Sequence, residues 1–318
     1  MLGGVASMNQ QKEVIRAVMV FDTWDSTSSV RARPYAYELS GQDFLRAEPS
    51  LWFPRALMPL MGCPGIESLP LQKIRKLHVS HLLYFLDYTT ELEMTIVNKA
   101  VNCMVHGELS MHFSVGERSA VLKLYADEGY HALFSKDLAE QIAGYHRLER
   151  YRSVRLKHLS RLLARCSGKW EELALFVMAF ISETVITREL SLLGQDDLNV
   201  PVLSMLRDHL HDEAKHSVFF ADCFVKLWGQ ASTAERDFVV NALLVVVRIF
   251  CRPDISFIRS QAKDTALCRE RVVNHLRQNW RRRVASTLQL TLKAVRRTDL
   301  LSNASYFRQL KNEGWIDE

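Results

Sequence analysis

The sequence contains one five-residue motif twice, DEGYH at 127–131 and DEAKH at 212–216. Both copies read D-E-x-x-H, and the three-residue step from Glu to His places the two side chains on one face of an α-helix. A single E-x-x-H is weak evidence, because glutamate and histidine are common on exposed helices. Two copies on buried faces are stronger evidence, because a buried polar group without a partner is costly. The repeat therefore predicts two long helices that turn carboxylates and imidazoles inward.

Mostly apolar residues continue the face of each motif at the spacing of an amphipathic helix. Around the first motif this stripe contains Val121, Leu124, Ser135 and Leu138. Around the second motif it contains Val202, Met205, Phe220 and Leu227. Both motifs are therefore expected on the core-facing side of their helices.

The rest of the chain indicates an all-α protein. Its 318 residues are 48% hydrophobic but include only 13 glycines and 8 prolines, so long stretches carry no helix breaker. We expect helices near residues 72–105, 115–142, 150–165, 170–194, 201–228, 233–258 and 265–297. Residues 1–40 lack sustained periodicity, which predicts an N-terminal surface tail with little chemistry. Residues 41–318 are expected to form a single helical domain.

The six cysteines are far apart and form no C-x-x-C pair. With no recognisable secretory signal, we expect reduced thiols and a cytoplasmic protein. The most apolar run, residues 238–250, is too short to span a bilayer. The chain also lacks zinc-finger spacing and a Gly-rich phosphate loop. We therefore expect neither a membrane nor a nucleic acid as a partner.

Two E-x-x-H helices form a di-iron site when two further helices each contribute a carboxylate. Glu93 continues the apolar stripe of the helix near 72–105, whereas Glu91 lies on a more polar face, so Glu93 is preferred. In the helix near 170–194 the choice is between Glu183 and Glu189. Glu183 is preferred because it continues an apolar stripe and because ETVIT at 183–187 resembles EMTIV at 93–97. Both choices remain open from the sequence alone.

A third histidine, His209, lies one turn before the glutamate of the second motif. Offsets of four and seven residues place Glu213 and His216 within about 40° of it around the helix. His211 points away from this face. We therefore predict three histidine ligands instead of the two that an ordinary pair of motifs supplies.

Charge is consistent with this set of ligands. Four carboxylates neutralise two ferrous ions, and neutral imidazoles add no charge, so the site can lie in a core. Asp127 and Asp212, directly before the motif glutamates, are expected to accept hydrogen bonds from imidazole N–H groups. The seven predicted metal ligands are Glu93, Glu128, His131, Glu183, His209, Glu213 and His216.

The order and spacing of these seven residues resemble the di-iron N-oxygenases of the p-aminobenzoate N-oxygenase type. The resemblance covers roughly residues 75–230, and its most specific part is the H-x-x-x-E-x-x-H pattern at 209–216. It implies a ferritin-like four-helix bundle with additional helices and a di-iron site in the bundle core. It also implies that the di-iron centre uses O2 to oxidise a primary amine to a hydroxylamine, nitroso or nitro compound.

The resemblance further implies cofactors and partners. The cofactors are two iron ions, Fe2+ or Fe3+, and O2, with a reductase or a small molecule as the external electron donor. The substrate is a free arylamine or an amino-acyl group tethered to a carrier protein, and the setting is secondary-metabolite biosynthesis. Residues 271–297 contain eight Lys or Arg and no Asp or Glu. This basic stretch is compatible with an acidic carrier protein, with the surface of a homodimer or with a solvated helix face.

Other di-iron activities are alternatives to amine oxidation. Iron-storage and ferroxidase chains of the ferritin type are usually much shorter than this one. Acyl desaturases use two E-x-x-H helices without the third histidine. A radical-generating subunit needs a redox tyrosine, and Tyr125 and Tyr130 flank the first motif, but surface or packing roles are commoner for such residues. The amine N-oxygenase is therefore the favoured prediction.

Overall fold

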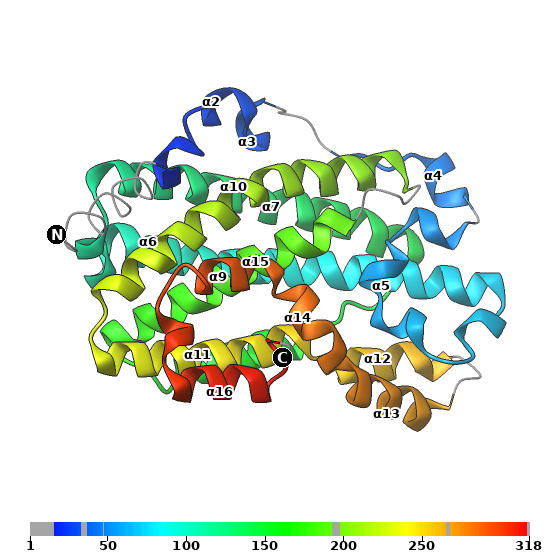
Figure 1. Cartoon of the computed structure of the whole chain (residues 1–318). Helices are drawn as coiled ribbons and strands as arrows, with labels where there is room; N and C mark the ends of the chain where they lie inside the picture. Colours follow the sequence, from blue (N-terminus) through cyan, green and yellow to red (C-terminus); the bar gives the residue numbers. More distant parts are fainter. Residues whose placement is uncertain (1–15, 33–36, 47, 193–197, 265–267, 317–318) are drawn as a thin grey trace.

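Helices make up all the regular secondary structure in the part of the chain that the structure describes (Figure 1). The computed structural model describes residues 16–32, 37–46, 48–192, 198–264 and 268–316. No strand occurs in these ranges. The prediction of an all-α fold is confirmed.

Four long helical segments form a bundle that runs the length of the molecule (Figure 1). The first consists of α5 (Leu71–Leu92), the π-helical turn η5 (Glu93–Val97) and α6 (Asn98–His106). The other three are α7 (Val115–His146), α9 (Lys169–Leu190) and α10 (Val200–Gln230). α5 packs against α7, and α9 packs against α10. The bundle therefore brings together the four helices that were expected to contribute ligands.

Local sequence signals explain where two of these helices begin. Ser114 caps α7 by accepting a hydrogen bond from the backbone N–H of Glu117, whose side chain accepts in return from the backbone N–H of Ser114. This reciprocal capping box satisfies two N–H groups that the helix itself cannot. Pro201 lies in the first turn of α10, where its missing N–H costs nothing.

The helix α9 lies at the centre of the molecule. Its stretch LALFVMAFI, residues 173–181, is buried on every side. A helix that is apolar all round needs neighbours on all faces, and α9 has them in α10, α11 (Thr233–Cys251), α8 (Val154–Leu163) and α15 (Gln289–Val295). Glu183 is therefore carried into a deeply buried part of the fold.

The end of the chain departs from the predicted helices. The helix expected at 233–258 ends at Cys251, because Pro253 disfavours helical backbone at the preceding residue, and Arg252 is extended. A separate helix, α12 (Ile255–Gln261), follows. The long helix expected at 265–297 is also interrupted. Its described part consists of α13 (Arg269–Asn279), the 3-10 turn η9 (Trp280–Arg283), α14 (Val284–Thr287) and α15.

Short elements cover the bundle. The N-terminal helices α2 (Trp24–Thr27) and α3 (Ser29–Ala32) lie beside α7 and α10, and α3 contacts both (Figure 1). The helix α4 (Gly41–Leu45) leads into 3-10 turns between residues 49 and 68. The final helix, α16 (Ala304–Asn312), was not predicted. Among the described residues, no helix combines the length and the apolar character that crossing a membrane requires.

Candidate metal centre

The first carboxylate of the cluster comes from the π-helical turn η5. Glu93 begins this turn and is 5% exposed. A π-helical turn accommodates an extra residue in an otherwise α-helical segment and is frequent at functional sites. Ile96 and Val97 in the same turn are buried with Glu93, whereas Met94 is half exposed. The wide turn therefore places the glutamate and its apolar neighbours together on the inner face.

The first motif lies in the middle of α7, where Glu128 and His131 are fully buried. Nδ1 of His131 is 3.3 Å from Oε2 of Glu128 and 3.3 Å from Oε1 of Glu213 on α10. The imidazole therefore lies between carboxylates of two different helices.

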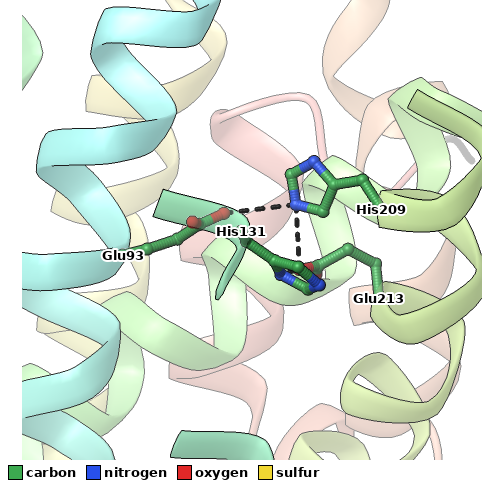
Figure 2. Close-up of side chains that lie close together, drawn as sticks. All are labelled: Glu93, His131, His209 and Glu213. Carbon is green, nitrogen blue, oxygen red and sulfur yellow. Dashed lines mark hydrogen bonds and ion pairs between the residues drawn. The ribbon is translucent and has the colours of Figure 1, made fainter. Parts of the chain in front are cut away.

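Glu213 of the second motif and the third histidine, His209, lie on one face of α10 and converge with Glu93, as Figure 2 shows. Nε2 of His209 is 3.2 Å from Oε1 of Glu93 and 3.2 Å from Oε1 of Glu213. Nδ1 of His216 is 2.9 Å from Oε1 of Glu128. The face that carries these groups is the one that helical spacing indicated.

The fourth carboxylate, Glu183, comes from α9 and is 1% exposed. Its Oε2 lies 3.5 Å from Nδ1 of His216. Thr187, one turn later, is buried, and its hydroxyl lies 2.7 Å from the carbonyl oxygen of Glu183 and 2.8 Å from that of Glu213. The hydroxyl therefore holds α9 and α10 together at the level of the cluster.

Two aspartates orient the histidines in a crossed arrangement. Nε2 of His131 on α7 lies 3.3 Å from Oδ2 of Asp212 on α10. Nε2 of His216 on α10 lies 3.2 Å from Oδ2 of Asp127 on α7. A carboxylate accepts hydrogen bonds and does not donate them, so each Nε2 carries a proton, and Nδ1 is the nitrogen that faces the glutamates. Both imidazoles are thereby held in the orientation that a metal ligand needs.

Six of the seven predicted ligands, all except Glu183, form two groups, each with its potential ligand atoms within 4.8 Å of one another. One group contains Glu93, His131, His209 and Glu213, and the other contains Glu128, His131, Glu213 and His216. His131 and Glu213 belong to both groups. Two adjacent positions that share ligands are what a dinuclear centre requires.

Several buried atoms in the cluster form no hydrogen bond. They are Nδ1 of each of the three histidines, Oε2 of Glu93, both carboxylate oxygens of Glu128, Oε2 of Glu183 and Oε2 of Glu213. Buried polar atoms in folded proteins are nearly always paired. Imidazole nitrogens and carboxylate oxygens are suitable donors for iron. The residues therefore fit two iron ions.

Burial and mutual repulsion shift the pKa values of the carboxylic acids. Burial raises the pKa of Glu93 to about 7, although His209 beside it favours the charged form. Burial raises the pKa of Glu183 well above its usual value, and the charges of two neighbouring glutamates add to the effect. For Glu213, burial favours the neutral acid, but the three histidines around it outweigh that effect and hold the pKa well below its usual value. Divalent cations would supply the positive charge that allows all four carboxylates to ionise together.

Comparison with known proteins assigns the chain to a family. The family model of the p-aminobenzoate N-oxygenase AurF matches residues 39–299. The chain belongs to this family. AurF-family proteins are ferritin-like di-iron N-oxygenases, so this chain is a di-iron oxygenase whose substrate is an amine. A search of the curated proteins finds no match.

All seven predicted ligands of this AurF-family chain lie in the one buried cluster described above. The alternatives lie elsewhere. Glu91 forms an ion pair with Arg152 at 3.0 Å near the surface. Glu189 lies near Arg155, whose positive charge opposes the effect of burial on its pKa. His211 is exposed.

A cavity of about 710 Å³ borders the cluster. Three carboxylates of the cluster, from Glu93, Glu183 and Glu213, form part of its wall. Aromatic side chains supply much of the remaining lining, namely Phe53, Tyr84, Phe85, Tyr88, Phe250, Phe257 and Trp280. Its size falls within the usual range for small-molecule sites. A small organic molecule can therefore reach the carboxylates through this space.

Residues 24–29 contradict the expectation that residues 1–40 form a tail with little chemistry, although residues 1–15 and 33–36 lie outside the described part of the chain. Ser28 and Ser29 are buried. The indole Nε1 of Trp24 and the Ser28 hydroxyl donate to Asp127, and the backbone N–H and hydroxyl of Ser29 donate to Asp212. The helices in this segment are one turn long, so no periodicity marks them in the sequence. The sequence signal for these contacts was indirect: buried aspartates beside metal ligands need hydrogen-bond donors, which another segment of the chain must supply.

Proposed function

We propose that this protein uses O2 to convert a primary amine into the hydroxylamine, and in further rounds into the nitroso or nitro compound. The cluster binds the two iron ions, with Glu93, Glu128, His131, Glu183, His209, Glu213 and His216 as ligands. When bound, the iron supplies the redox chemistry that activates O2. The observation that carries the proposal is the shared wall between the carboxylate cluster and an organic-sized cavity.

The protein's own part in the reaction is binding, orientation and exclusion of water. The aromatic wall of the cavity can stack against the ring of an arylamine. Arg155, which also lines the cavity, lies over the ring of Tyr88 at 5.6 Å and supplies positive charge for an anionic substituent. An amine held between these groups would have its nitrogen turned toward the carboxylates of the cluster.

The first oxidation step needs a reductant. One O2, two electrons and two protons convert the amine into the hydroxylamine and one water. We propose that an external donor, either a reductase or a small molecule, supplies the two electrons.

A carrier protein is one source of the amine. His275, Arg282 and Arg283, all in the basic stretch 271–297, line the same cavity. The basic stretch therefore lies at the cavity as well as on the surface. We propose that it docks an acidic carrier protein whose tethered amino-acyl group enters the cavity, as charge complementarity favours. A role in secondary-metabolite biosynthesis rests on the same proposal.

The experiment loads the metal-free protein with Fe(II) without oxygen, adds O2 and a chemical reductant, and measures oxygenated amines by mass spectrometry. We expect two irons per chain and a product 16 Da heavier than an arylamine such as p-aminobenzoate, the mass of one added oxygen atom. Oxidation of many irons per chain without an oxygenated amine would instead support iron storage. Desaturated acyl chains as the only product would support a desaturase.

The carrier proposal needs a second comparison. Arg282→Gln together with Arg283→Gln should slow oxidation of a carrier-bound amine and leave oxidation of the free amine less affected. Arg308→Gln, an exposed arginine on α16, is the matched control. Equal turnover of both substrates by all three proteins would remove the docking proposal.

A further inference from the structure

A short N-terminal segment reaches the buried aspartates of the metal centre. This strap, residues 24–32, consists of α2, Ser28 and α3, and it lies over α7 and α10 (Figure 1). It lies before residue 39, where the family match begins. Two lysines of the bundle form hydrogen bonds with the strap and with the residues just before it. Lys123 of α7 donates to the carbonyl of Phe21, and Lys215 of α10 donates to the hydroxyl of Thr27, each at 3.0 Å.

The first contact is with Asp127. Nε1 of Trp24 lies 2.9 Å from each of its two carboxylate oxygens, and the Ser28 hydroxyl donates to Oδ1. Oδ2 of Asp127 also accepts a hydrogen bond from Nε2 of His216. The strap donors therefore fix the carboxylate in the orientation that receives the imidazole proton.

The second contact is with Asp212. The backbone N–H of Ser29 lies 3.1 Å from Oδ2, and the Ser29 hydroxyl donates to the same oxygen. Nε2 of His131 also reaches this oxygen. Ser28 thus donates to Asp127, and Ser29 donates to Asp212. Each aspartate also accepts a hydrogen bond from a histidine on the opposite helix.

Packing alone does not explain this arrangement. Phe21, just before the strap, stacks near the ring of His216 and contributes apolar contact. The two serine hydroxyls contribute little apolar area, yet both are buried and both are directed at a carboxylate. Such outer hydrogen bonds set the orientation and basicity of metal-binding histidines.

We propose that Trp24, Ser28 and Ser29 are positioning residues of the metal centre, acting on His216 through Asp127 and on His131 through Asp212. The proposal rests on the proposed metal-binding role of the cluster. The strap holds both aspartates, so both imidazoles keep the proton on Nε2 and offer Nδ1 to the metal.

Metal binding without turnover tests the proposal. The metal-free full-length protein is titrated without oxygen with Co(II) alone, which takes the same nitrogen and oxygen donors as iron, and the visible absorption of the bound ion is recorded. Ser28→Ala, Ser29→Ala and Trp24→Phe should each weaken binding by about threefold to tenfold and change the absorption. Ser26→Ala is the matched control, because Ser26 lies in the same segment, is exposed and bonds only to the carbonyl of Thr23.

A double-mutant comparison separates positioning from general stability. If Ser28 acts through Asp127, Ser28→Ala should have no further effect on affinity in an Asp127→Asn background. It should keep its full effect in an Asp212→Asn background, because contacts through separate partners add. Ser29→Ala should show the reverse pattern. A merely structural serine would add its effect in both backgrounds.

The outcomes distinguish failure of the strap from failure of the centre. Unmodified protein that does not bind about two Co(II) per chain would overturn the metal site itself. Normal binding by the unmodified protein, with the three variants equal to Ser26→Ala, would overturn the positioning role alone. Additive effects in both aspartate backgrounds would also overturn it. Thermal unfolding of each metal-free variant, measured beside the titration, shows that the fold is retained.

Discussion

Replacing Asp127 by asparagine should weaken iron binding without removing any ligand. Asp127 is fully buried, and its Oδ1 accepts from Ser28 while its Oδ2 accepts from Nε2 of His216. Asparagine has one acceptor oxygen and an NH2 group that donates. If the oxygen stays with the two donors of the strap, the NH2 group faces His216. That imidazole must then accept at Nε2 and carry its proton on Nδ1, the nitrogen that faces Glu128.

The size of the effect follows from the bond that is lost. A hydrogen bond to a charged group contributes about 1.5–3 kcal/mol, and each 1.4 kcal/mol corresponds to a factor of about ten in affinity. Loss of a hydrogen-bond partner of a metal-binding histidine typically lowers metal affinity by about 10–100-fold. We therefore expect Asp127→Asn to bind Fe(II) about 10–100-fold more weakly than the unmodified protein, as these two ranges agree.

The assay is an anaerobic titration with Fe(II) in competition with a coloured chelator. Asp137→Asn is the control, because it makes the same change at an exposed position of the same helix. It should titrate like the unmodified protein. Equal Fe(II) affinity of Asp127→Asn and Asp137→Asn would refute the reasoning, since the tautomer of His216 would then not depend on the aspartate.

Three further results are expected. Glu183→Ala should hold fewer than two irons per chain after anaerobic loading and desalting, whereas Glu189→Ala should still hold two; the opposite result would reverse the ligand assignment. Burial raises the pKa of Glu93 to about 7, so in the metal-free protein this group binds a proton as the pH falls through that value, and Fe(II) must displace it. Chelator competition should therefore show weaker Fe(II) binding at about pH 6 than at about pH 8, and equal affinities would contradict this. Thr187→Val, which removes the hydroxyl between α9 and α10, should lower the free energy of unfolding in urea by about 1 kcal/mol. Thr95→Val, at an exposed hydroxyl, is its control, and equal unfolding midpoints would argue against the link.

The positions of the ligands were predictable because helical spacing relates sequence directly to direction. Glu128 and His131 are three residues apart, and His209 precedes Glu213 by four, so each pair must share a helix face. The same rule separated His211 from its neighbours. Glu93 was predicted because it continues an apolar stripe, although no local pattern indicated the π-helical turn that carries it.

Other features depend on how elements meet and could not be predicted from local patterns. The sequence placed Asp127 beside Glu128, but only the packing of α7 against α10 shows that its imidazole partner is on the opposite helix. The strap is invisible to periodicity because each of its helices is one turn long. The break in the predicted helix 265–297 involves tertiary contacts, including the guanidinium of Arg252 at 5.0 Å from the ring of Trp280. Pro253 was an available signal for the end of α11, but the prediction of one helix over 233–258 extended past it and was wrong.

The crossed aspartates make α7 and α10 equivalent, because each helix contributes one aspartate that accepts a hydrogen bond from a histidine on the other helix. An equivalent pair of helices would build two identical metal positions. The position on α7 that corresponds to His209 lies four residues before Glu128, and it holds Leu124, which is fully buried. At equivalent positions, α10 therefore carries the imidazole of His209 and α7 carries the hydrocarbon side chain of Leu124. Within this pair of helices, a single side chain therefore breaks the symmetry of the repeated motif.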